Sequence, residues 1–521
     1  MPSPNQPEGK AQGPFVVICA DLGDEPAPLA VSELAEALGS KLPGAKVSVA
    51  ARVCESEKAL TDVLGDAHPQ RVVLGCRAGA RARGDLLASL RNAGVPAAGA
   101  DIVDLRAGRE CSRDAALVES EALLGAAAAR VAAADLETPS KERVSFSVGG
   151  MSRRSLFRGV GRARRPIATL REERCGRSVS CTVCLLSCRH GALRQEGGRL
   201  VVDGDRCTAC GACVLACHRG ALSLAGADLG ALGAAAGVLV ESIERDTPAN
   251  GVAVTCQDAA AGPLLGEGWL SLKVPSLEMV SAGWLLQFLS RGVGVRLVGC
   301  GEKECTERGA NLRAFVEELA GALGRPVGGL LSTTGATGPD ETAGLPLKAA
   351  ICLAEPDATV DALRSLGALD PDCPPWRAGG PGCPLGTVTV ESTGCSLCGA
   401  CVSVCPTGAL STHRDGTGPL GLFLDPLCCT ACGVCVLTCP EHVISLEKQL
   451  GSESMTAGKQ ALAIAPVSQA LCESCGIPLP TALSASALSR LGAYSFLAEA
   501  ADRVCANCRL RGRSVAARQG T

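Results

Sequence analysis

Cysteine is the residue type whose number and spacing in this sequence indicate chemistry. The chain has 31 cysteines, and sixteen of them fall into four short runs. The runs are Cys175, Cys181, Cys184 and Cys188; Cys207, Cys210, Cys213 and Cys217; Cys395, Cys398, Cys401 and Cys405; and Cys429, Cys432, Cys435 and Cys439. A thiolate at every third residue wraps a short loop around a cube of iron and sulfide, so this spacing predicts [4Fe–4S] clusters.

The first run differs from the other three. Three runs read C-x2-C-x2-C-x3-C without deviation, whereas in the first Ser178 stands where the pattern has a cysteine and Cys175 lies three residues upstream. We therefore expect four clusters, with the first held by a longer loop or present as a labile three-iron site.

The runs occur in two close pairs, and these pairs resemble bacterial-type two-cluster ferredoxins. In such proteins the last cysteine of one run ligates the cluster of its partner run. The resemblance implies four ligand sets: Cys175, Cys181, Cys184 and Cys217; Cys207, Cys210, Cys213 and Cys188; Cys395, Cys398, Cys401 and Cys439; Cys429, Cys432, Cys435 and Cys405. Cys428 is off register and is expected to be spare.

Two further C-x2-C pairs lie near the end of the sequence, at Cys472 and Cys475 and at Cys505 and Cys508. Four thiolates in two such pairs suit tetrahedral coordination of Zn²⁺ or of a single iron ion. We expect a structural zinc, because the residues between the pairs are typical of helices and lack the aromatic core of a rubredoxin. The ion would fold a tail too small to be stable alone.

Composition narrows the classes of function and location. A net charge of -3 gives no electrostatic case for nucleic-acid binding. Metal-binding thiolates require a reducing compartment, and the first fourteen residues show no secretory signal. We therefore predict a cytoplasmic protein without membrane insertion.

Hydrophobic patterning predicts a multidomain fold that combines α/β domains with smaller α+β modules. Short apolar strands alternate with helices over 15–140 and again over 238–345, which predicts two parallel sheets covered by helices. We expect this order of segments: a disordered tail (1–14), the first α/β domain (15–140), an arginine-rich linker (141–172), a first two-cluster module (173–225), the second α/β domain (238–345), a linker (346–390), a second two-cluster module (391–447), and a helical segment with the zinc site (448–521).

Each α/β domain has a family resemblance of its own. The stretches VVICADLG, VAARVCES, RVVLGC and LRNAGVPAAGADIVDLRAGREC resemble the amino-terminal region of the flavin-containing subunit of heterodisulfide reductase. They contain Cys19, Cys54, Cys76 and Cys111, which could bind a further cluster or act as small core residues. The flavin domain of that family and its G-x-G-x-x-G motif are missing here, so no flavin is expected in this chain.

The middle domain resembles the delta subunit of the methyl-viologen-reducing hydrogenase. The match is strongest in LLQFLSRGVGVRLVGCGEKECTERGANLRAF, which holds Cys300 and Cys305, and Cys256 fits an earlier cysteine of the family. Ala259 stands where that family has another cysteine. A [2Fe–2S] centre would therefore need Cys352 or Cys373; otherwise the domain would serve for docking without a metal.

These features predict an iron–sulfur electron-transfer subunit rather than a stand-alone enzyme. The sequence shows no nucleophile elbow, P-loop or metalloprotease helix. The family resemblances imply redox partners of the hydrogenase, formate dehydrogenase, heterodisulfide reductase or flavoprotein type. Two alternatives stay open: direct reduction of a small substrate at an unusual cluster, and a redox-linked assembly or regulatory scaffold.

Overall fold

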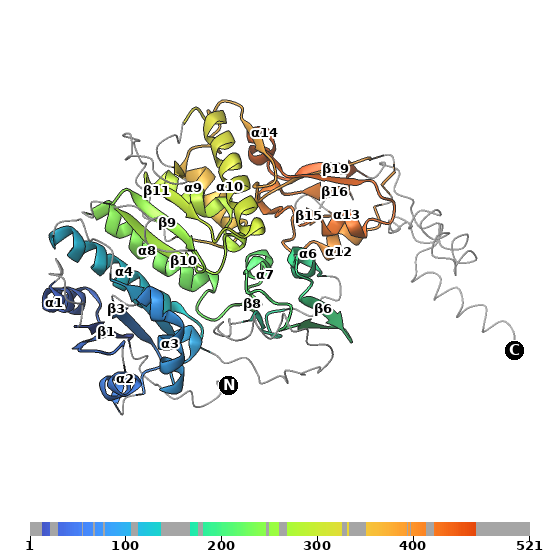
Figure 1. The fold of residues 1–521 in the computed structure, drawn as a ribbon. Helices are drawn as coiled ribbons and strands as arrows, with labels where there is room; N and C mark the ends of the chain where they lie inside the picture. The colour runs from blue at the N-terminus through green and yellow to red at the C-terminus, as the bar shows by residue number, and fades with distance from the viewer. Residues whose placement is uncertain are drawn as a thin grey trace, which may run out of the picture. The chain divides into compact units, whose positions relative to one another are not determined.

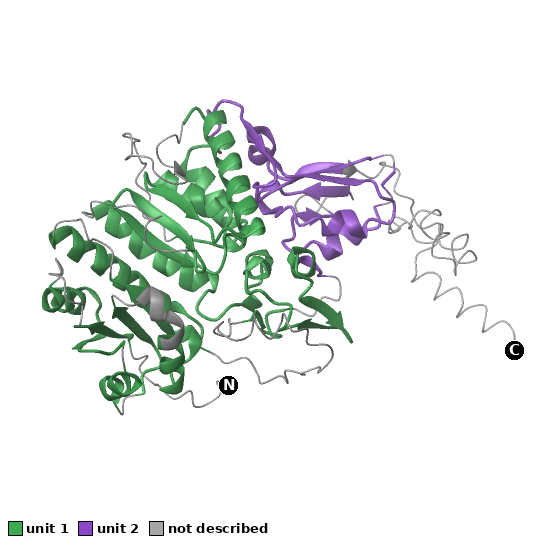
Figure 2. Cartoon of the chain, in the orientation of Figure 1, with its two compact units in different colours: residues 1–177, 184–368 green, residues 178–183, 369–521 purple. Residues whose placement is uncertain are grey.

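The chain forms two compact units. The computed structural model describes residues 13–20, 30–54, 56–65, 68–76, 79–105, 113–136, 167–175, 181–245, 249–259, 268–325, 331–332, 351–392, 394–395, 397–412 and 421–464. Unit 1 comprises residues 1–177 and 184–368, and unit 2 comprises residues 178–183 and 369–521 (Figure 2). Unit 1 therefore holds both α/β domains and most of the first cysteine-rich module, and unit 2 holds the second module.

The first α/β domain is built on a parallel sheet of order β2-β1-β3-β4 (Figure 1). Its strands are β1 (Phe15–Cys19), β2 (Lys46–Ala50), β3 (Val72–Cys76) and β4 (Ala100–Asp104). The helices are α1 (Val31–Lys41), α2 (Glu57–Leu64), α3 (Gly79–Asn92), the short η2 (Ala97–Gly99) and α4 (Arg113–Ala133).

Alternate side chains of β1 pack into two hydrophobic cores, one on each face of this sheet. Val17 and Cys19 pack in one core with side chains of α2 and α3, and Val16 and Ile18 pack in the other with side chains of α1 and α4. Successive residues of a strand point to opposite faces, so a strand covered on both faces is apolar throughout. The predicted parallel sheet with helices on both faces is confirmed.

The second α/β domain repeats this sheet order, here as β10-β9-β11-β12. Its strands are β9 (Gly251–Cys256), β10 (Trp269–Val274), β11 (Gly294–Val298) and β12 (Leu331–Ser332). Its helical elements are α8 (Leu229–Arg245), η3 (Leu277–Met279), α9 (Ala282–Ser290) and α10 (Lys303–Ala322). Helix α8 packs against α4 of the first domain.

The region 346–390, for which the sequence predicts a linker, contains regular structure. Helix α11 (Asp357–Ser365) packs against α9, and the Trp284 indole donates a hydrogen bond of 2.7 Å to the carbonyl of Leu353. Strands β13 (Arg377–Gly379) and β14 (Thr387–Val390) follow. A helix of nine residues is marginal by itself, and its packing against α9 stabilises it.

The first module contains β5 (Thr169–Leu170), α6 (Val183–Ser187), β6 (Leu193–Glu196), β7 (Arg199–Val202), α7 (Ala212–Ala216) and β8 (Leu222–Ser223). Strands β6 and β7 form a hairpin that turns at Gly197 and Gly198. These glycines have φ of 57° and 78°, as a two-residue I′ turn requires.

The second module contains α12 (Ala400–Val404), β15 (Leu410–Ser411), β16 (Gly421–Leu424), η4 (Pro426–Cys428), α13 (Val434–Thr438), β17 (Ile444–Glu447), β18 (Gln449–Gly451), α14 (Ser452–Thr456) and β19 (Gln460–Ile464). Strand β14 pairs with β17 and β13 with β18, both antiparallel.

None of the helices in the described part of the chain has both the length and the apolar character needed to cross a membrane.

Candidate iron–sulfur sites

The three regular cysteine runs share one backbone conformation. Immediately before the second cysteine stands a residue with positive φ, and immediately after it stands a glycine with φ between 75° and 81°. The residues are Ala209 and Gly211, Leu397 and Gly399, and Ala431 and Gly433. Each glycine is the N-cap of a five-residue helix, α7, α12 or α13, on which the third cysteine lies. The three loops therefore make the same turn between the second and third cysteines.

One cavity in each module is lined by three cysteines of one run and the last cysteine of the partner run. In the first module the cavity is lined by Cys207, Cys210, Cys213 and Cys188. In the second module the cavity is lined by Cys395, Cys398, Cys401 and Cys439. The rest of each lining is largely apolar, as a site that limits access of water to iron and sulfide requires.

The second run of the second module has a similar thiol neighbourhood. Burial raises the pKa of Cys429 to about 12 and that of Cys435 to about 11, and the Cys405 thiol adds to both shifts. Cys405 is thus electrostatically coupled to this run although it belongs to the other one. In the first module burial, together with the neighbouring thiols of Cys210, Cys207 and Cys188, raises the pKa of Cys213 to about 12. Metal coordination is what would remove these protons.

Backbone amides point at several of these thiols. The amide of Ala192 donates a hydrogen bond to the Cys188 sulfur, and the amide of Ala221 donates one to the Cys217 sulfur. The distance from nitrogen to sulfur is 3.3 Å in both. Hydrogen bonds to sulfur are among the determinants of a cluster's reduction potential. The two outgoing cysteines of the first module therefore accept the same backbone hydrogen bond, from the amide four residues later.

Comparison with known families identifies these runs. Residues 200–223 and 388–411 match the model of the 4Fe-4S binding domain. The chain contains two ferredoxin-type 4Fe-4S domains. The matches include the Cys207–Cys217 run and the Cys395–Cys405 run, one in each module, and they indicate iron–sulfur electron transfer. No curated protein matches the chain significantly.

The ferredoxin-type sites also involve residues that sequence reasoning missed. Ligand atoms of His190, Cys210 and Glu278 lie within 4.8 Å of one another. Burial raises the pKa of the Glu278 carboxyl, although His190 and Arg189 act in the opposite direction. Glu278 lies in η3 of the middle domain, which packs against α7. Nothing in the sequence connects Glu278 with Cys210, since they are far apart along the chain and no motif includes both.

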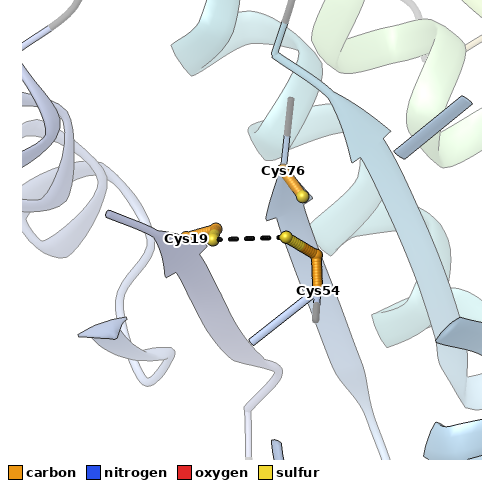
Figure 3. Close-up of side chains that lie close together, drawn as sticks. All are labelled: Cys19, Cys54 and Cys76. Carbon is orange, nitrogen blue, oxygen red and sulfur yellow. Dashed lines mark hydrogen bonds between the residues drawn. The ribbon is translucent and has the colours of Figure 1, made fainter. Parts of the chain in front are cut away.

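The first α/β domain brings three of its cysteines together at the carboxyl edge of the sheet. Cys19 is the last residue of β1, Cys76 is the last residue of β3, and Cys54 follows β2 (Figure 3). The Cys19 and Cys54 sulfurs are 3.8 Å apart, and all three sulfurs lie within 4.8 Å of one another. Burial raises the pKa of the Cys54 thiol, an effect that the contact with Cys76 opposes. Cys111 lies outside the described residues.

The second α/β domain also brings three cysteines together. They are Cys256, Cys300 and Cys305, whose sulfurs lie within 4.8 Å of one another. Cys256 ends β9, Cys300 lies just beyond β11, and Cys305 is in the first turn of α10. The hydrogen bond between Cys256 and Cys305 lowers the pKa of Cys305 to about 5. The same contact raises the pKa of Cys256.

The remaining predicted ligands are placed in part or not at all. The Cys352 thiol contacts the carbonyl oxygen of Ala354 at 3.9 Å and is not part of the Cys256 group, and Cys373 belongs to unit 2. In the first run Cys181 is exposed, and Ser178 lies outside the described residues. The ligand set of Cys175, Cys181, Cys184 and Cys217 stays a prediction. So does the zinc site of Cys472, Cys475, Cys505 and Cys508, which lies entirely outside the described residues.

Proposed function

We propose that this chain is an electron-transfer subunit that relays single electrons through four [4Fe–4S] clusters between partner oxidoreductases. The observation that carries the proposal is the pair of 4Fe-4S domain matches, each of which includes a run that lines a cavity together with the outgoing cysteine of its partner run. The crossed arrangement of ligands expected from two-cluster ferredoxins agrees with these linings.

The residues of the chain would supply binding, shielding and tuning. Four thiolates would hold each cluster, and the bound iron and sulfide would accept and release one electron at a time. Apolar side chains such as Leu193 and Val202 in the first module, and Leu422 and Ile444 in the second, limit access of water. The amides of Ala192 and Ala221 would stabilise the added negative charge on the reduced site.

The finer parts of this proposal concern partners, zinc and location. The resemblances of the two α/β domains favour complexes in which a hydrogenase or formate dehydrogenase feeds a heterodisulfide reductase, directly or through a flavoprotein. A zinc ion on Cys472, Cys475, Cys505 and Cys508 would fold the last part of the chain. We propose a cytoplasmic location, because thiolate-bound clusters need reducing surroundings.

A second candidate is direct reduction of a small substrate at the first cluster. The exposure of Cys181 favours it, because a solvent-accessible iron could bind a ligand. Turnover of a disulfide by the purified chain with dithionite, without any partner subunit, would favour this function over a pure relay.

The deciding measurement is iron and acid-labile sulfide per chain in anaerobically purified protein, followed by a potentiometric titration monitored by electron paramagnetic resonance. Four cubes predict about 16 iron and 16 sulfide per chain and a brown chromophore that bleaches on reduction. Protein that stays colourless after reconstitution, or a chromophore that strong reductants cannot bleach, would sink the proposal.

A further inference from the structure

Each α/β domain brings three thiols together, and two of the three occupy equivalent positions in the two domains. Both sheets have the same strand order, in which the first strand of each lies between the second and the third. In both, one thiol ends the first strand, at Cys19 and Cys256, and another lies at or just beyond the end of the third strand, at Cys76 and Cys300. The carboxyl ends of parallel strands are the usual location of ligand sites in such sheets. The arrangement therefore occurs twice in independent parts of the chain.

The spacing of the sulfurs distinguishes these triads from the ferredoxin-type sites. A tetrahedral ion with Zn–S bonds of about 2.3 Å holds its sulfur ligands about 3.8 Å apart. The Cys19 and Cys54 sulfurs are 3.8 Å apart (Figure 3). Within each triad, all three sulfurs lie within 4.8 Å of one another. Among the described residues, no three cysteines of a ferredoxin-type module converge to that distance. Each thiolate of a cube binds a different iron, so its ligands have to lie farther apart.

In the middle domain, the number of available ligands also argues against an iron–sulfur cluster. A [2Fe–2S] centre needs four protein ligands, two on each iron. Ala259 occupies the position of a fourth cysteine, and Cys352 is directed to the carbonyl of Ala354. The amide of Cys352 donates to the Gln287 side chain at 3.1 Å, which further fixes this segment against α9. The residues present therefore do not fit the cluster that the family resemblance implies.

We propose that each triad binds a single Zn²⁺ ion through three thiolates, and that neither α/β domain carries an iron–sulfur cluster. Thiolates are soft ligands that select zinc among the common divalent ions. The half-buried Cys300 leaves the middle site open to a water molecule as fourth ligand. Since zinc has no redox chemistry, electrons would travel through the ferredoxin-type modules alone, and each ion would instead tie together segments distant in sequence.

The test is the metal content of single-cysteine variants of the full chain, purified anaerobically. Cys54→Ser and Cys256→Ser should each lose about one zinc per chain, with iron and sulfide unchanged. Cys352→Ser is the matched control in the same domain and should keep all its metal. Loss of iron and sulfide from a triad variant, or zinc content equal to that of the control, would overturn the proposal, as would copper at these sites.

A measurement on the unaltered chain covers the case in which the variants do not fold. Anomalous scattering from crystals, recorded on both sides of the zinc and iron edges, locates each element directly. A zinc peak among the sulfurs of Cys256, Cys300 and Cys305, without an iron peak, is the expected result. An iron peak there, or no anomalous peak in either triad, contradicts the proposal.

Discussion

Met279 packs so closely over Gly211 that no side chain fits between them. A Cβ atom at Gly211 would lie 2.7 Å from the Met279 sulfur and 2.9 Å from its Cβ. Gly211 is the N-cap of helix α7 of the first module, and Met279 ends η3 of the middle α/β domain. This contact joins a loop that binds a predicted cluster to the domain that holds the Cys256 triad.

Replacement of Gly211 by alanine should therefore do more damage than the same change at Gly399. Both glycines have left-handed φ, so alanine at either costs about 1–2 kcal/mol. Nothing lies within 4 Å of a Cβ at Gly399, whereas at Gly211 the side chain would displace Met279. We expect Gly211→Ala to be the less stable variant and to shift the resonance spectrum of the Cys207–Cys213 cluster, measured by thermal unfolding and electron paramagnetic resonance. Equal losses in the two variants would show that the contact is unimportant.

Cys439→Ser should remove the cluster built on Cys395, Cys398 and Cys401, because Cys439 lines that cavity. The expected loss is about four iron per chain, with the signal of the Cys429 run retained. Cys428→Ser is the control, since Cys428 is absent from that lining, and it should keep full iron content. A Cys439→Ser protein that loses the Cys429-run signal instead would disprove the crossed assignment.

Stability should fall as pH rises from about 5 to 7, because of Glu355. Desolvation in the protein interior raises the pKa of this carboxyl to about 7, although Ser281 and Thr359 donate hydrogen bonds to it and Arg308 lies nearby. Between its ordinary pKa and 7 the unfolded chain ionises while the folded chain keeps the proton. The free energy of unfolding therefore decreases over this range, by about 3 kcal/mol, and levels off above it.

The Glu355→Gln variant should lack this part of the pH dependence. The measurement is the difference in unfolding free energy or midpoint between variant and wild type from pH 5 to 8. Asp361→Asn, at an exposed carboxyl on the adjoining α11, should keep the wild-type slope. A parallel profile for Glu355→Gln and wild type would mean that Glu355 ionises normally.

Two glycines of α8 should respond in opposite directions to alanine. At Gly237 nothing lies within 4 Å of an added Cβ, so Gly237→Ala should stabilise the chain by about 0.5–1 kcal/mol through helix propensity. At Gly233 the Cβ would lie 2.9 Å from the carbonyl oxygen of Ile351, and Gly233→Ala should destabilise it by about 1–3 kcal/mol. Chemical denaturation of both variants checks the pair. Stabilisation by Gly233→Ala would mean that the Ile351 segment moves freely.

Much of the fold follows from local patterns. The runs that form β1, β3, β9 and β11 are buried throughout and mostly apolar, as is typical of strands covered on both faces, and helices alternate with them as the sequence predicts. The prediction of a linker over 346–390 differs from the structure, in which this region contains a helix and two strands. Helix α11 owes its stability to contacts with α9, about 70 residues earlier in the chain, and a short sequence pattern contains no trace of such a partner.

The cluster-binding runs can be recognised from residue spacing, because most ligands of a cluster lie within a few residues of one another. That spacing by itself predicts binding of a [4Fe–4S] cluster. Which distant thiols meet depends instead on the packing of whole elements. Cys19, Cys54 and Cys76 converge because the carboxyl ends of parallel strands share one edge. Cys352 does not join the Cys256 group, because its segment is held against α9. Glu278 and Met279 reach α7 because η3 packs there. Contacts of this kind arise only when the sheets and helices assemble, and the order of residues along one segment does not encode them.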